Sequence, residues 1–120
     1  MGSNAPEAKQ IMKKVVFTVI RDFRGKRPSV HPSAYVDMAA TVIGDVSLEE
    51  GVNVWPGAII RGDVEPISIG RRASIQDGAI IHTDPGRPTA IGEGCTIAHG
   101  CIIHGCRIGK NTLVAIGAVI

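Results

Sequence analysis

Aliphatic residues recur at intervals of six over most of this 120-residue chain. The interval is broken by a few insertions and by two steps of five residues, the ones that lead to Ile80 and to Ile102. Repetition at a fixed short period is typical of solenoids, in which each repeat forms one structural unit. The predicted inward column consists of Val30, Val36, Val42, Leu48, Val54, Ile60, Ile69, Ile75, Ile80, Ile91, Ile97, Ile102, Ile108, Val114 and Ile120.

A second column supports the first, because the fourth residue after most of these aliphatics is small. Aromatic residues make up only 3% of the chain, so small side chains must build its core. Three of them are cysteines, which we expect to pack as reduced small hydrophobes without a disulfide. The second column consists of Ala34, Ala40, Val46, Val52, Ala58, Ala73, Ala79, Cys95, Cys101, Cys106, Thr112 and Ala118.

The repeat predicts an all-β fold, a parallel β-helix of hexapeptide repeats with a triangular section. Three short strands and three turns make one coil, and strands stack on the coils above and below at about 4.8 Å. We predict about five coils over residues 30–120. Residues 1–29 lie outside the repeat and form an N-terminal extension whose "VVFTVIRDF" segment reads as a strand and possible cap. Because the repeat runs to Ile120, we expect no C-terminal cap and an open strand edge.

Charge and hydropathy exclude two classes of partner. The net charge is +2, from 13 basic and 11 acidic residues, without the basic stripe that nucleic-acid binding needs. No stretch approaches the roughly 20 apolar residues of a membrane helix. We therefore expect a soluble cytoplasmic protein that binds neither nucleic acid nor membrane.

The triplet Ile-Ile-His occurs twice, ending at His82 and at His104. The repeat places these two histidines at one corner of consecutive coils, where two imidazoles can share a metal ion. His99 falls at the preceding corner and needs a neighbouring copy of the chain to reach that ion. Three histidines with an open fourth position are typical of a catalytic zinc site. Each histidine taken alone also fits a solvated turn residue.

Four segments together resemble the gamma-class carbonic anhydrase family, whose members are left-handed hexapeptide β-helices. They are "VIGDV", "VWPGAIIRGD", "RRASIQDGAIIHTDPG" and "CTIAHGCIIHGC", and the likeness extends from about Arg24 to Ile120. The resemblance implies a homotrimer that hydrates carbon dioxide to bicarbonate. It also implies one zinc, iron or cobalt ion at each subunit interface, with His82, His99 and His104 as ligands.

The resemblance implies further site residues. Arg61 and Asp63 match an Arg-x-Asp pair that forms ion pairs across the interface. Gln76 matches a glutamine that hydrogen-bonds the solvent on the metal, and Asp77 matches an acidic residue that supports the site. Polar turn chemistry is the alternative explanation for Gln76 and Asp77.

The chain also departs from the family's founding enzyme. Val64 stands in the place of an active-site glutamate, Ser74 in that of an asparagine, and the long acidic loop is reduced to "TDPGRP", whose only acid is Asp84. Proton export needs such acids, so we expect slow hydration. Two alternatives stay open: a catalytically silent scaffold trimer of the same fold, and a hexapeptide acyltransferase or thioesterase-like enzyme.

Overall fold

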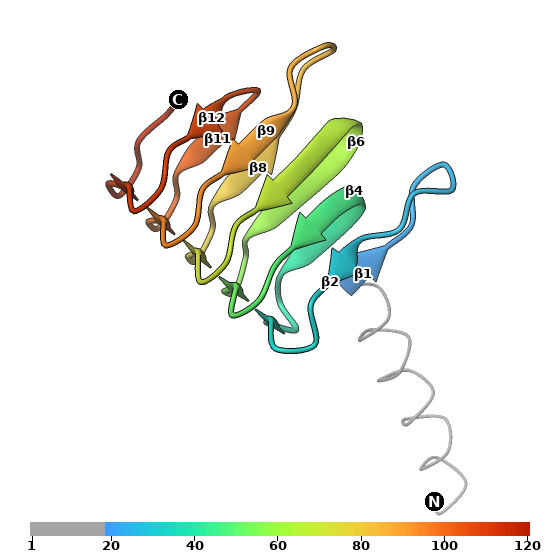
Figure 1. The fold of residues 1–120 in the computed structure, drawn as a ribbon, viewed down its shortest axis with the longest axis horizontal. Coiled ribbons are helices and arrows are strands. Elements are labelled where there is room, and N and C mark those ends of the chain that lie inside the picture. Colours follow the sequence, from blue (N-terminus) through green and yellow to red (C-terminus); the bar gives the residue numbers. More distant parts are fainter. Residues whose placement is uncertain (1–18) are drawn as a thin grey trace, which may run out of the picture.

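The chain winds as a parallel β-solenoid of about five coils, as the repeat predicts (Figure 1). The structure, a computed structural model, describes residues 19–120. The strands are β1 Ile20–Arg21, β2 Ser29–Val30, β3 Tyr35–Val36, β4 Thr41–Leu48, β5 Asn53–Val54, β6 Ile59–Ile69, β7 Ser74–Ile75, β8 Ile80–His82, β9 Thr89–Ile91, β10 Thr96–Ile97, β11 Ile102–His104, β12 Arg107–Ile108 and β13 Leu113–Val114.

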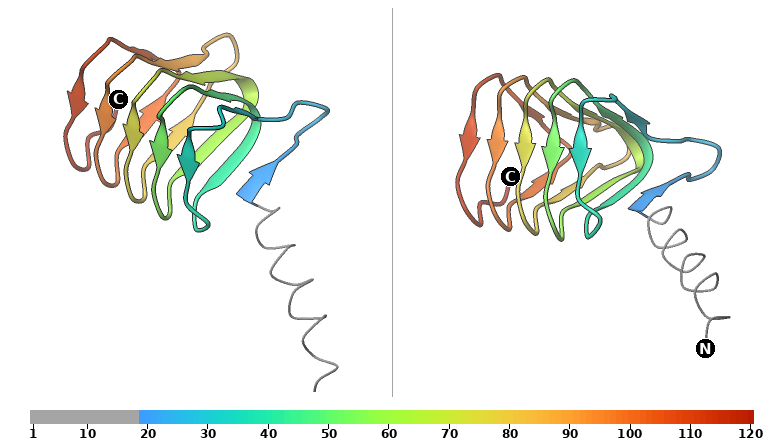
Figure 2. Two further views of the ribbon diagram at one scale, coloured as in Figure 1. Left: turned by 60° about the horizontal axis from the view of Figure 1, so that its bottom comes forward. Right: turned by 90° about the horizontal axis from the view of Figure 1, so that it is seen from below.

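Strands that lie one coil apart in the sequence pair in parallel along the solenoid axis. One face carries the ladder β3-β5-β7-β10-β13, which is visible as a row of short arrows in Figure 2. The other two faces are continuous, because the long strands β4 and β6 bend around the corner between them. We call the face that carries β8 and β11 the isoleucine face, since Ile59, Ile80 and Ile102 point outward from it in register.

Both predicted columns point inward over most of the chain. Side chains of the two columns alternate with outward residues along each strand, as side chains two apart share a face. The structure adds buried residues that the pattern missed, among them Ile67 and Thr89, each 1% exposed, Thr83, fully buried, and Ala98, 5% exposed. The buried core comprises Ala40, Val42, Val46, Leu48, Val52, Val54, Ala58, Ile60, Ile67, Ile69, Ala73, Ile75, Ala79, Ile81, Ile91, Cys95, Ile97, Ala98, Cys101, Ile103, Ile108 and Val114.

The predicted register was wrong at Ile80 and Ile102. These side chains are 40% and 37% exposed, whereas Ile81 and Ile103 are fully buried. The six-residue step is therefore kept into both strands, and the short step lies later, between Ile103 and Ile108. Gly105 absorbs it with a φ of 58°, a left-handed conformation that glycine adopts without strain.

Length variation is concentrated at one corner of the triangle. We count as a link the residues between two successive inward-facing residues on either side of a corner. The links at the other two corners have the same length in every coil, as in residues 49–51 and 76–78. The links at the third corner are residues 43–45, 61–66, 82–88 and 104–105. We call this the histidine corner, because it carries both His82 and His104; the link 82–88 projects from it beside β9 (Figure 1).

The N-terminal segment also contacts the first coil. β1 pairs in parallel with the start of β4, and β2 pairs with its end, so residues 20–30 add a layer to the stack. The division into 1–29 and 30–120 stays a prediction, and the part of the extension before residue 19 lies outside the described residues. Within residues 19–120 we find no helix with the length and hydropathy needed to cross a bilayer.

Candidate functional site

His82 and His104 stack one above the other at the histidine corner. β8 and β11 pair in register, with His104 opposite His82. Their ring centroids lie 5.1 Å apart and the ring planes are tilted by 54°. The His82 side chain is 19% exposed and that of His104 is 37% exposed. Both imidazoles thus meet solvent on one side and the solenoid wall on the other.

Two buried threonines hold the backbone around these histidines. The Thr89 hydroxyl donates to the carbonyl oxygen of His82 at 2.7 Å and accepts from the amide of Gly105 at 2.9 Å. The Thr83 hydroxyl accepts from the Glu65 amide at 3.1 Å. Both threonines are buried, so these bonds tie the links 61–66, 82–88 and 104–105 of the histidine corner to one another.

Asp63 joins the Arg-x-Asp pair to the histidine stack. One carboxylate oxygen lies 2.8 Å from Nε2 of His82, and the other accepts from the Arg61 guanidinium at 2.5 Å. Partial burial acts to raise the pKa of Asp63, but the hydrogen bonds from His82 and Arg61 outweigh it and hold the pKa below its ordinary value. The Arg61–Asp63 ion pair lies within one chain, and whether it extends across an interface stays a prediction.

A second carboxylate reaches the stack from the short loop. Asp84 Oδ1 lies 2.7 Å from Nε2 of His104, and Asp84 is held by an antiparallel bridge to Arg87. The sequence singled out Asp84 as the acid of this loop without predicting that contact. The Asp-Pro-Gly-Arg run is a tight-turn signal and predicts the hairpin, although not the residue that its first side chain meets.

The remaining predicted residues lie at the corner before the isoleucine face, which we call the glutamine corner. Gln76 and Asp77 follow β7, and His99 occupies the equivalent link one coil on. Nδ1 of His99 lies 3.3 Å from a carboxylate oxygen of Asp77, and its side chain is 54% exposed. Gln76 and His99 line a largely apolar cavity of about 500 Å³ together with Thr96, Ala98, Leu113, Ala115 and Ile116.

The structure thus brings the candidate residues together in two groups rather than one. Arg61, Asp63, His82 and His104 lie at one end of the isoleucine face, and Gln76, Asp77 and His99 lie at the other. Within residues 19–120, no group of three or more His, Cys, Asp or Glu side chains is placed to hold a metal ion in a single chain. The described part of a single chain therefore does not bring His82, His99 and His104 to one place.

Relatives with known names share this chain's pattern, although no family model matches it. A carbonic anhydrase of Geobacillus kaustophilus is 38% identical over 102 residues, which cover 85% of this chain and 56% of that protein. The chain belongs to the gamma-class carbonic anhydrase-like family of hexapeptide-repeat proteins. The protein YrdA of Escherichia coli is 38% identical over 109 residues, which cover 85% of this chain and 59% of that protein.

Solved structures agree on the left-handed hexapeptide β-helix. A hexapeptide transferase family protein from Anaplasma phagocytophilum superposes with a TM-score of 0.72 at 28% identity, over 86% of this chain and 75% of that one. This gamma-class chain spans less than three fifths of the length of the carbonic anhydrase it resembles. Two chemistries therefore occur by name among its neighbours, and the site residues must decide between them.

Proposed function

We propose that this protein reversibly hydrates carbon dioxide at metal sites shared between the subunits of a homotrimer, and that it does so slowly. The observation that carries the proposal is the in-register stack of His82 on His104 at one end of the isoleucine face, with His99 at the other end. A copy of the chain packed against this face brings the His99 of one chain towards the histidine stack of the next.

The donors fit a divalent ion such as zinc, iron or cobalt. Two imidazoles that bind one tetrahedral ion at about 2.1 Å have ring centroids roughly 5 Å apart. The observed separation is 5.1 Å. Each of the three histidines also has a carboxylate beside it, and such partners orient ligand rings and raise their basicity. When bound, an ion with an open position supplies hydroxide near neutral pH.

The other side chains have separate tasks in this proposal. Asp63 fixes the ring of His82, and Arg61 holds Asp63 in its ionised form. Gln76, at the glutamine corner, supplies an amide that can donate to or accept from solvent at the shared site. Asp77 orients His99 through its Nδ1 contact. The Val64 side chain has no titratable group and cannot accept a proton. Proton release from the site therefore depends on Asp84 or on diffusible buffer.

The exposed surface of the isoleucine face supports a second copy of the chain as its occupant. Its outward row is Ile59, Ile80, Ile102 and Val119, which are 39%, 40%, 37% and 73% exposed. The row runs between the two groups of candidate residues. A contact that joins one end of this face to the other end of the same face on the next copy forms a closed ring when three copies complete a full rotation.

Heterotrimers test the shared site directly. One chain carries His99→Ala and the other carries His82→Ala with His104→Ala, and the two are mixed after co-expression. Neither variant alone should retain metal, whereas a mixed trimer has one complete set of donors and should bind about one ion. Metal content is measured by mass spectrometry on anaerobically purified protein. Full metal loading of either variant alone, or none in the mixed trimer, would show that the site is not shared.

A second candidate is acyl transfer, favoured by the transferase neighbours and by the apolar cavity beside His99. In this function His99 acts alone as a general base and an acyl group occupies the cavity. Metal content separates the two functions, because acyl transfer by a single histidine should survive complete removal of metal. Loss of all activity with the metal would exclude it.

A further inference from the structure

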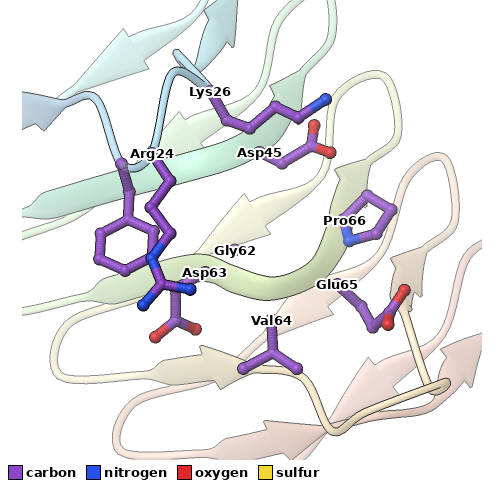
Figure 3. A pocket seen from close by; sticks show the side chains of 9 residues that line it. Arg24, Lys26, Asp45, Gly62, Asp63, Val64, Glu65 and Pro66 are labelled. Carbon is purple, nitrogen blue, oxygen red and sulfur yellow. The ribbon is translucent and has the colours of Figure 1, made fainter.

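A polar cavity of about 220 Å³ lies beside the histidine corner, and none of the three predicted metal ligands lines it. Its roof is the turn between β1 and β2, and its floor is the stretch of β6 that includes Gly62, Asp63 and Val64 (Figure 3). Asp63 is the one residue that it shares with the histidine stack. The cavity therefore opens on the side of Asp63 that faces the N-terminal hairpin.

The hairpin that forms the roof is tightly built. Phe23 and Lys26 form an antiparallel bridge, with two backbone hydrogen bonds of 2.9 Å. Arg24 and Gly25 have φ values of 47° and 78°, as in a two-residue type I′ turn. Such a φ is unfavourable for arginine, because its Cβ approaches the backbone. The Arg24 guanidinium lies over the Phe23 ring at 5.3 Å from its centroid.

The cations of the roof form no ion pair in the described part of the chain. Neither the Arg24 guanidinium nor the Lys26 ammonium has a carboxylate oxygen within ion-pair distance there, although both line the cavity. Both oxygens of Asp63 are engaged by Arg61 and His82. The cavity therefore presents cationic donors from above that pair with no carboxylate among residues 19–120.

The residues that β4 and β6 contribute to the cavity include acceptors. Asp45 makes no side-chain hydrogen bond or ion pair in the described part of the chain. Glu65 accepts one bond, from the Gly86 amide at 3.1 Å. An anion without a proton would be repelled by these carboxylates. A small oxyanion that carries one hydroxyl can accept from Arg24 and donate to a carboxylate at the same time.

We infer that this cavity binds hydrogencarbonate, with Arg24 as its principal donor. The ion carries one negative charge and one hydroxyl, which match unpaired cations on one wall and carboxylate acceptors on the other. Its role as the product of hydration rests on the proposed function, since the cavity adjoins Asp63 and would receive the anion as it leaves the site. Binding itself requires only the hairpin and β6.

The test is a titration of metal-free trimer, so that it does not depend on catalysis. Backbone amide signals of Gly62 and Val64 are followed by NMR during addition of sodium bicarbonate at constant ionic strength. We expect saturable shifts, weakened roughly tenfold or more in Arg24→Asn, since a charge-assisted hydrogen bond is lost. Asparagine tolerates positive φ, so the hairpin is preserved.

Arg27→Gln is the matched control, because Arg27 lies on the same hairpin but pairs with Asp22 at 2.8 Å. Arg27→Gln should leave the affinity for bicarbonate unchanged. Sodium acetate, which has no hydroxyl, should bind at least about tenfold more weakly. Equal affinity of Arg24→Asn and the wild type, equal binding of acetate, or tighter binding of inorganic phosphate would each overturn the inference. Saturable bicarbonate binding in protein that never takes up metal would support bicarbonate binding in this cavity and contradict the proposed metal site.

Discussion

At the scale of single residues, the aspartates beside the three histidines are the main feature of the candidate site. Each candidate ligand histidine has its own aspartate, and Asp63 also has Arg61. Val64 interrupts this pattern, because it places an aliphatic side chain, 45% exposed, next to Asp63. In the proposed site, the metal-binding part is thus complete in residue types, whereas the proton-releasing part lacks an acidic side chain at position 64.

We predict that hydration by the wild type is slow and rises with the concentration of a small buffer such as imidazole. Positioned proton transfer contributes about 10²–10⁴-fold, so Val64→Glu should raise the rate at low buffer by roughly tenfold. Stopped-flow measurements at fixed pH and ionic strength check this, with Val64→Leu as the control. A wild type that is fast and indifferent to buffer would contradict the missing proton acceptor.

A pH dependence is expected at Glu93, away from the site. Its hydrogen bond with Arg71 and the charge of that guanidinium lower the pKa of Glu93 from its usual value of 4.5. A carboxyl whose pKa is lower in the folded state stabilises the fold above the unfolded pKa, and this stabilisation is lost as the pH falls through the folded value.

The substitution Glu93→Gln should therefore lower the melting temperature at about pH 6, and the difference from the wild type should vanish by about pH 3. Glu50→Gln is the control at the same corner, since the Glu50 side chain makes no hydrogen bond in the described part of the chain. A difference that persists at the lower pH would assign the effect of Glu93 to packing instead.

At the scale of elements, the close contact of β4 with β6 builds the Arg-x-Asp turn. Gly44 lies opposite Gly62, and the register shifts between Gly44 and Val46. A Cβ on Gly62 would overlap the carbonyl oxygen of Asp45. Glycine is required there by close approach of two backbones, which also sets where Arg61 and Asp63 project.

We predict that Gly62→Ala destabilises the fold by about 1–3 kcal/mol, the usual range for overpacking a close-packed contact. Gly109→Ala is the control, since a Cβ there meets nothing within 4 Å and its φ is not positive. Denaturant unfolding monitored by circular dichroism measures both. Equal stability of the two variants would mean that β4 and β6 can separate without cost.

The repeat was sufficient to predict the solenoid, the inward columns and the stack of His82 on His104. The prediction chose Ile80 over Ile81 because both are isoleucine, although the constant length of the link at 76–78 keeps the six-residue step from Ile75 to Ile81. Strand pairing confirms Ile81 as the inward residue, since Ile81 lies opposite the buried Ile60. The contacts of Asp84 and Arg24 were also missed. Both residues lie in hairpins outside the repeat, where the hexapeptide pattern gives no register.

At the scale of the whole molecule, the isoleucine face is the surface that the proposed trimer would bury. Its outward row is apolar, in contrast to the outward residues of the adjoining ladder, where Ser68 pairs with Ala90 and Ala90 with Arg107. Burial of this row against another chain would stabilise a trimer at about 25 cal/mol per Å² of apolar surface removed from water.

We therefore predict that Ile80→Asp combined with Ile102→Asp converts the trimer to folded monomers. Both side chains point outward, so the core is untouched, and an unpaired buried charge at the interface is costly. Ala90→Asp places the same charge on β9 and should remain trimeric. Sedimentation velocity gives the mass, and circular dichroism shows that the fold persists. A trimer that survives the double substitution would place the interface elsewhere.

The uneven links of the histidine corner have a consequence for how such a chain can change. β6 takes up three more residues than β4 at this corner and still returns to the same partners, from Val46 opposite Ile67 to Leu48 opposite Ile69. Insertions and deletions at the histidine corner leave the remaining coils in place. One residue added at 76–78, where every coil has the same length, would instead shift the inward-facing residues of the next strand outward. New chemistry can thus be acquired by lengthening residues 83–88 alone, and libraries that vary loop length at this corner are the economical way to search for it.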